Sequence, residues 1–79
     1  MSDQMDALLH VIQNTEQVLA ERNGWIRPIG TIHSNAKLYL PAYINDEVDA
    51  LVKLLGQQNK LELIADPWNP DQLLGVRLK

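Results

Sequence analysis

The sequence contains no cysteine and no phenylalanine. Without cysteine the chain can form neither a disulfide framework nor a thiolate zinc site, which fits a reducing, intracellular setting. Because phenylalanine is absent and aromatic residues make up only 5% of the chain, leucine, isoleucine and valine must form the core. The hydrophobic fraction of 46% is normal for a folded protein. We therefore expect one small globular domain over residues 1–79.

Long apolar runs are also absent. No stretch approaches the ~20 consecutive apolar residues that a membrane-spanning helix needs. The first four residues, Met1-Ser2-Asp3-Gln4, lack the basic start and the apolar stretch of a secretory signal peptide. We therefore expect a cytoplasmic protein that has no contact with a membrane.

Positive charge is scarce and unevenly placed. The formal net charge of −3 argues against strong, non-specific attraction to nucleic acid. Residues 1–21 contain acidic side chains and no lysine or arginine, whereas residues 22–44 contain Arg22, Arg27 and Lys37 and no acid. A local basic zone therefore lies between two acidic ones, and any contact with nucleic acid is expected there.

The clearest pattern is the apolar spacing of residues 45–57. Apolar side chains recur at i, i+3, i+4 and i+7, which lines one face of an α-helix; they are Val48, Leu51, Val52 and Leu55. Asn45 can cap the helix start, the acidic residues of the first turn complement the helix dipole, and Gly56 supplies a stop. The sequence therefore predicts a helix over 45–57.

A second amphipathic stretch predicts a helix over residues 3–22, with Asn23-Gly24 as its stop. Its apolar band is wide, and it consists of Met5, Leu8, Leu9, Val11, Ile12, Thr15, Val18 and Leu19. The band can pack across the rest of the domain, or part of it can pair with a second copy of the chain as a homodimer. The periodicity alone does not separate these two uses.

The residues between the two helices are less clearly patterned. Pro28 excludes helix over residues 25–29, so we expect a short extended segment there. Residues 31–39 fit either a short helix capped by Thr31 or a hairpin that turns at Ser34-Asn35. We favour the helix, and Pro41 then breaks it.

The last part of the chain alternates between apolar and polar residues. This alternation predicts strands over 60–65 and 73–78. The intervening loop contains Pro67 and Pro70, which exclude a tight two-residue turn. We expect the two strands to pair as an antiparallel ribbon with one apolar face.

This order of elements resembles a winged helix-turn-helix domain. The resemblance rests on residues 32–40, the turn at Pro41, the apolar stripe of 48–55, the exit at 58–64 and the closing strand at 74–78. It implies a small α+β winged helix of three helices followed by a two-stranded antiparallel wing. It also implies that the third helix and the wing bind DNA, or that the same scaffold contacts proteins.

The sequence is also similar, over two short stretches, to the swapped-hairpin DNA-binding domains of bacterial transition-state regulators and antitoxins. The similarity lies in residues 37–41 and 59–64. That fold would need residues 46–53 as a strand, against their 3.6-residue periodicity. The winged helix is therefore the preferred prediction.

No group of residues has the spacing of a catalytic or metal site. The two histidines, His10 and His33, lack a second ligand at a recognised spacing, and the glycines do not form a phosphate-binding loop. The acidic residues at the start of 45–57 are explained by the helix dipole, because the glycine and terminal glutamate of a calcium loop are missing. We expect no enzyme activity, no metal and no cofactor.

For nucleic acid, the residues of the third helix and those of the basic zone give opposite indications. The exposed side of the third helix would carry Asp46 and Asp49, which repel phosphates where a recognition helix usually reads bases. The better candidates lie mainly in the basic zone and on the ribbon. They are Arg22, Arg27, His33, Ser34, Asn35, Lys37, Lys53, Lys60, Trp68 and Asn69.

The leading hypothesis from the sequence is a small protein that binds double-stranded DNA. It would be a transcriptional regulator that acts as a dimer through its first helix. The alternative is a protein-interaction module on the same scaffold, in which the acidic helix face (Asp46, Asp49) binds or inhibits a basic partner that itself binds nucleic acid.

Overall fold

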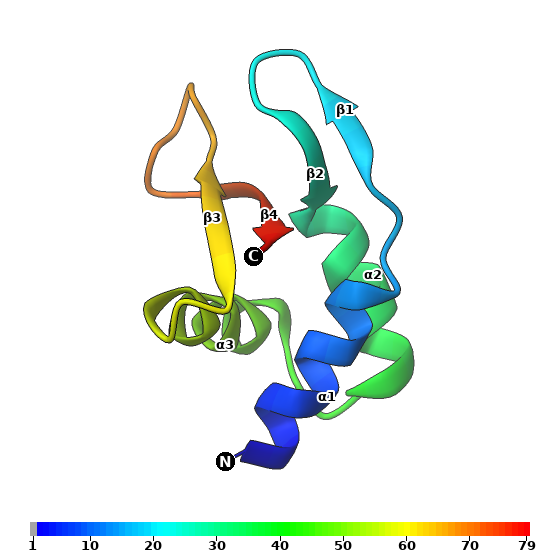
Figure 1. The fold of residues 1–79 in the computed structure, drawn as a ribbon. Helices are drawn as coiled ribbons and strands as arrows, with labels where there is room; N and C mark the ends of the chain where they lie inside the picture. The colour runs from blue at the N-terminus through cyan, green and yellow to red at the C-terminus, as the bar shows by residue number, and fades with distance from the viewer. Residues whose placement is uncertain (1) are drawn as a thin grey trace.

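The computed structural model describes residues 2–79 as three helices and one four-stranded sheet (Figure 1). The elements in chain order are α1 Ser2–Gln13, β1 Val18–Ala20, β2 Gly24–Pro28, α2 Ile29–Tyr39, α3 Asn45–Gln57, β3 Leu61–Ala65 and β4 Leu73–Leu78. The sheet is antiparallel with the strand order β1-β2-β4-β3. Figure 1 shows the helices gathered at one end of the molecule, with the β1–β2 and β3–β4 turns pointing away from them. The chain therefore has the expected α+β class.

The sheet corrects the predicted two-stranded ribbon. β3 and β4 do pair, but β4 also pairs with β2, and β2 pairs with β1. In the second of these pairings Arg27 lies opposite Val76, and Pro28 lies opposite Gly75. A Cβ atom on Gly75 would lie 2.5 Å from the Arg27 carbonyl oxygen, so β2 approaches β4 this closely only because residue 75 has no side chain.

The first helix ends at Gln13, so the prediction of one helix over 3–22 is wrong beyond that residue. The Asn14 side chain donates to the His10 carbonyl, and the Thr15 hydroxyl donates to the Val11 carbonyl, each at 2.8 Å. These side chains satisfy carbonyls of the last turn and favour leaving the helix. The chain then forms β1, turns at Asn23-Gly24, where Gly24 has φ +72°, and returns as β2.

Residues 31–39 are helical, and their helix, α2, begins two residues earlier than predicted. Pro28 precedes its first turn with φ −66° and ψ 140°, so the segment changes from strand to helix at this proline without a loop. The ring fixes φ near −65°, a value that both conformations allow. The hairpin alternative is therefore excluded for this segment.

Helix α3 covers residues 45–57. At its start the Ile44 N–H donates to Glu47 Oε1 at 3.1 Å. At its end Asn59 has φ +64°, and the Lys60 N–H donates to the Leu55 carbonyl at 3.0 Å, which is a Schellman ending. Asn59 therefore ends this helix, rather than Gly56. Since residues 46–53 are helical, the swapped-hairpin layout does not apply.

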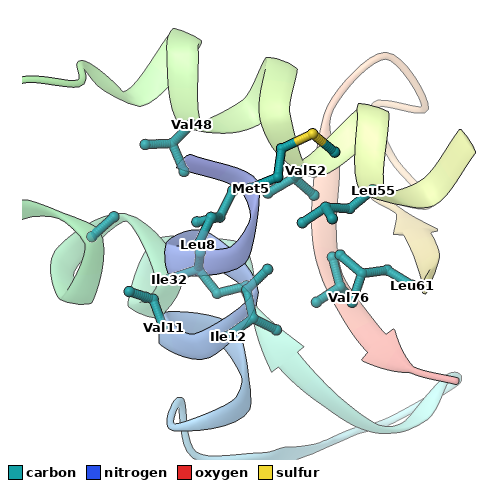
Figure 2. Packing of buried hydrophobic residues seen from close by; sticks show 11 residues of the cluster. Met5, Leu8, Val11, Ile12, Ile32, Val48, Val52, Leu55, Leu61 and Val76 are labelled. Atoms are coloured by element: carbon teal, nitrogen blue, oxygen red, sulfur yellow. The ribbon is translucent and has the colours of Figure 1, made fainter. Parts of the chain in front are cut away.

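The core lies where the three helices meet the sheet, and Figure 2 shows its side chains interdigitating. Its buried members come from every helix and from β3 and β4; they are Met5, Leu8, Val11, Ile12, Ile32, Ala36, Val48, Val52, Leu55, Leu61 and Val76. Most of the apolar band of α1 is thus covered inside the domain. None of the helices in residues 2–79 has the length and apolar character to cross a membrane.

Candidate functional site

A groove of about 350 Å³ separates helices α2 and α3 from the start of β4. We call it the acidic groove; it is lined by Ile29, His33, Asp46, Asp49, Lys53, Asp71, Gln72 and Leu73. The lining thus includes three aspartates and one lysine. The aspartates come from two distant parts of the sequence, because Asp46 and Asp49 lie on α3 whereas Asp71 lies in the β3–β4 loop. The groove therefore attracts cationic groups and repels phosphates.

A short hydrogen bond forms the wall of this groove. His33 Nε2 and Asp49 Oδ1 are 2.6 Å apart, and they join α2 to α3 across the connecting turn. A carboxylate only accepts, so the imidazole donates its Nε2–H. The His33 side chain is 19% exposed and the Asp49 side chain 34%. Asp49 keeps solvent access while bonded to His33, so it remains available to a cationic ligand.

The exposed side of α3 outside the groove has a mixed character. Its first turn is acidic, its middle carries Ala50, and its last turns carry the half-exposed Leu54 and the exposed Gln57. Lys53 is the one basic residue of this helix, and it lines the acidic groove. The helix therefore offers carboxylates and the side chains of Ala50 and Leu54 to a partner, with little positive charge.

Three of the side chains predicted to contact nucleic acid form hydrogen bonds within the domain. Arg27 donates to the backbone carbonyls of Gln13 and Thr15, which fixes β2 against the segment that follows α1. His33 is bonded to Asp49, and Asn35 Nδ2 donates to Thr15 Oγ1 at 3.1 Å. The sequence could not reveal these roles, because each partner lies at least 12 residues away.

The other predicted side chains lie on separate parts of the surface. Ser34 and Lys37 are exposed on α2, Lys53 lies in the acidic groove, and Lys60 follows α3. Arg22 and Trp68 line one cleft between the β1–β2 turn and the β3–β4 loop, with a volume of about 340 Å³. Asn69 is exposed beside Trp68 in the same loop. We call the cleft that Arg22 and Trp68 line the tip cleft. The structure thus brings together Arg22 with Trp68, and His33 with Lys53.

Asp71 and Gln72 are the groove residues that sequence reasoning missed. They follow Pro70 in a loop that carries no motif, and only the pairing of β4 with β2 and β3 sets them against α3.

Arg77, like Arg27, has a structural role that was not anticipated. Arg77 on β4 donates to Glu62 Oε1 at 3.0 Å and to the backbone carbonyls of Asn23 and Trp25. It fastens the β1–β2 hairpin to the rest of the sheet.

No protein-family model, curated protein or solved structure matches this chain. Within residues 2–79, no three histidine, cysteine, aspartate or glutamate side chains are grouped so that they could hold a metal ion. What the chain does must therefore be argued from its surface chemistry.

Proposed function

We propose that this chain is a protein-interaction module on a winged-helix scaffold, and that its acidic groove binds a basic segment of a partner protein. The element order supports the scaffold, with the β1–β2 hairpin in place of a single extended segment. In this layout α2 and α3 form the helix-turn-helix pair, and β3 and β4 form the wing. The acidic groove then lies between the third helix and the base of the wing.

The observation that carries this proposal is that Asp46, Asp49 and Asp71 line one groove whose lining contains a single lysine. A basic side chain entering the groove can pair with these carboxylates, and Ile29 and Leu73 supply apolar walls for the stem of a lysine or arginine. Carboxylates on two separate elements can engage successive basic residues of one segment. Such contacts favour association rate and specificity, and they weaken with salt.

The arginines give further support. Two of the three in the chain, Arg27 and Arg77, donate to backbone carbonyls of the domain. Arginine is the side chain best suited to phosphate recognition, because its planar guanidinium makes two parallel bonds. With two of these guanidinium groups engaged and the third helix acidic, a nucleic-acid surface would have to rely on scattered lysines and Arg22.

The test is an amide-shift titration of the whole chain with a short peptide of alternating lysine and leucine. We expect saturable shifts around residues 46–53 and 71–73, and we expect them to weaken as salt is added. The double variant Asp46→Asn with Asp71→Asn should reduce binding roughly tenfold, since each exposed ion pair contributes about 0.2–1 kcal/mol. The matched control is Asp3→Asn with Asp6→Asn on the exposed side of α1, which should bind as the unaltered chain does.

DNA binding is the second candidate, because Arg22 and Trp68 both line the tip cleft, although Glu21 and Asp66 line it as well. An aromatic ring beside a guanidinium can stack on a base and pair with a phosphate. The same titration with mixed-sequence duplex DNA at low salt separates the two functions. DNA binding would be the function if DNA gave saturable shifts confined to the tip cleft and Lys37, and the peptide gave none. The double variant Arg22→Glu with Lys37→Glu should then abolish the response to DNA.

A further inference from the structure

The hydrogen bond between His33 and Asp49 joins an imidazole ring to a carboxylate of the acidic groove. His33 lies on α2 and Asp49 on α3, and the distance from Nε2 to Oδ1 is 2.6 Å. Both residues line the groove. Histidine is the side chain whose ordinary change of charge falls between about pH 5 and 8. The wall of the groove therefore contains a group that can gain a positive charge in this range.

The charged groups around His33 come from its own helix and from two other parts of the chain. On α2 the charged side chain one turn further on, at i+4, is the exposed Lys37. The charged residues that line the groove with His33 are Asp46, Asp49 and Lys53 on α3 and Asp71 in the β3–β4 loop. Carboxyl groups ordinarily titrate at about pH 4 and lysines at about pH 10. The imidazole is thus the group through which pH acts on the groove between about pH 5 and 8.

Protonation of this ring alters both the charge of the groove and the pairing of Asp49. With a neutral imidazole, the three aspartates and one lysine of the lining carry a formal charge of −2. The added proton binds to Nδ1, because Nε2 already carries the hydrogen that it donates to Asp49. The formal charge of the lining then becomes −1, and Asp49 is paired with an imidazolium. A cationic ligand then meets less negative charge.

We propose that His33 is a pH switch of the acidic groove, which releases a basic segment of a partner when the imidazole takes up a proton. This inference rests on the proposed function of the groove and adds its regulation. The ligand's cation and the protonated ring compete for the carboxylate of Asp49, which is accessible because its side chain is partly exposed. His33 is partly exposed as well, so water can deliver the proton. Acidification therefore lowers the affinity for a basic segment.

The switch leaves the contact between α2 and α3 in place. The imidazolium still donates from Nε2 to Asp49, and a charge-assisted hydrogen bond is stronger than a neutral one. Release of the ligand therefore needs no opening of the helix pair. This separates the switch from acid denaturation, in which the folded structure itself is lost.

Peptide titrations at two pH values test the switch. The unaltered chain is titrated with the short lysine–leucine peptide at about pH 8 and at about pH 5.5, at one ionic strength. The dissociation constant should be about fivefold larger at the lower pH, because one added positive charge opposes the ligand. His33→Gln keeps a donor for Asp49 but takes up no proton, so its two dissociation constants should agree within about twofold. The control, His10→Gln at an exposed position of α1, should keep the full difference.

A second measurement needs only the unaltered chain, so it does not depend on the folding of a variant. If the peptide binds the neutral ring more tightly, it must weaken proton binding at His33 by the same factor. The ring resonances of His33 are followed by NMR from about pH 5 to 8, with and without saturating peptide. Protonation of His33 should be displaced to lower pH in the complex, whereas His10 should titrate alike in both.

Three results would overturn the switch: equal affinity of the unaltered chain at both pH values, a pH dependence that persists in His33→Gln, or protonation of His33 that the peptide does not displace. Each of these leaves the proposed function standing, because the peptide still binds. Absence of peptide binding at about pH 8 would overturn the proposed function, and the switch with it. Circular dichroism at both pH values checks that the helices persist.

Discussion

The helical core and the β1–β2 hairpin place the same kind of side chain in opposite surroundings. Leu8 on α1 is fully buried, whereas Leu19 on β1 is 67% exposed, although both belong to one apolar band in the sequence. The difference comes from what lies above each residue. Helices α2 and α3 pack against α1 around Leu8, but β1 has no further strand beside it in residues 2–79. A buried leucine here stabilises the fold, and an exposed one is available to a partner.

The largest expected effect comes from making the same substitution in both regions. Leu8→Ala should lower the free energy of unfolding by about 2–5 kcal/mol, because it removes buried methyl groups and leaves a cavity among packed neighbours. Leu19→Ala should change it by less than about 0.5 kcal/mol. Urea unfolding followed by circular dichroism at low protein concentration measures both. A loss above about 1 kcal/mol for Leu19→Ala would show that the hairpin contributes more to the fold than its exposure indicates.

A smaller effect is expected where the hairpin joins the core. Gly75→Ala should cost about 1–3 kcal/mol, because its Cβ would lie 2.5 Å from the Arg27 carbonyl oxygen and would push β2 away from β4. The matched control is Gly30→Ala in α2, where nothing lies within 4 Å of the new Cβ. This change should be neutral or should stabilise by up to about 1 kcal/mol through helix propensity. Equal losses from the two changes would contradict the close approach of β2 and β4.

The smallest of the three effects concerns the segment between α1 and β1. Thr15 is buried; its hydroxyl donates to the Val11 carbonyl and accepts from Asn35 Nδ2. Thr15→Val keeps the shape but leaves the Asn35 amide without this acceptor, which should cost about 1–2 kcal/mol. The control is Thr31→Val, at an exposed position near the start of α2. If chemical unfolding gave the same stability for both variants, the bridge from Thr15 to α2 would not stabilise the fold.

Helix α3 and the β3–β4 pair could be predicted because their signals are local. Val48, Val52 and Leu55 repeat with the helical period, and Leu61, Val76 and Leu78 alternate with polar neighbours. The helical pattern matches the burial that the structure shows, but the strand pattern does so only in part, because Ile64 is buried and Ala65 is exposed where the pairing of β3 with β4 is irregular. Here the side-chain periodicity and the tertiary contacts require the same conformation, so reasoning from a short window succeeds.

The β1–β2 hairpin could not be predicted with the same reasoning. Val18 and Leu19 continue the helical spacing of Leu8, Ile12 and Thr15, so the period favours one long helix. The competing signal was the pair Asn23-Gly24, which marks a hairpin turn as well as a helix end. The hydrogen bonds from Asn14 and Thr15 to carbonyls of the last turn of α1 end the helix there. The pairing of β2 with β4 then favours the hairpin over a longer helix.

The candidate site divides in the same way. Asp46 and Asp49 could be assigned to an exposed helix face from their spacing, but the groove also needs Asp71, which lies 22 residues farther along the chain than Asp49. Conversely, Arg27, His33 and Asn35 looked like free polar groups in the basic zone. Arg27 bonds to the backbone carbonyl of Thr15, His33 to the Asp49 carboxylate, and Asn35 to the Thr15 hydroxyl. These partners are distant in the sequence, so only the folded chain shows the bonds.

The sequence by itself determined the α+β class, the third helix and the final strand pair, because these depend on apolar periods within a few turns or strand lengths. Only the tertiary structure decided that residues 18–28 form a hairpin, that the sheet has four strands, and that three aspartates line one groove. The physical reason is that these features arise from contacts between residues far apart in the chain. Whether a polar or apolar side chain is covered, paired or left open depends on which distant element packs against it.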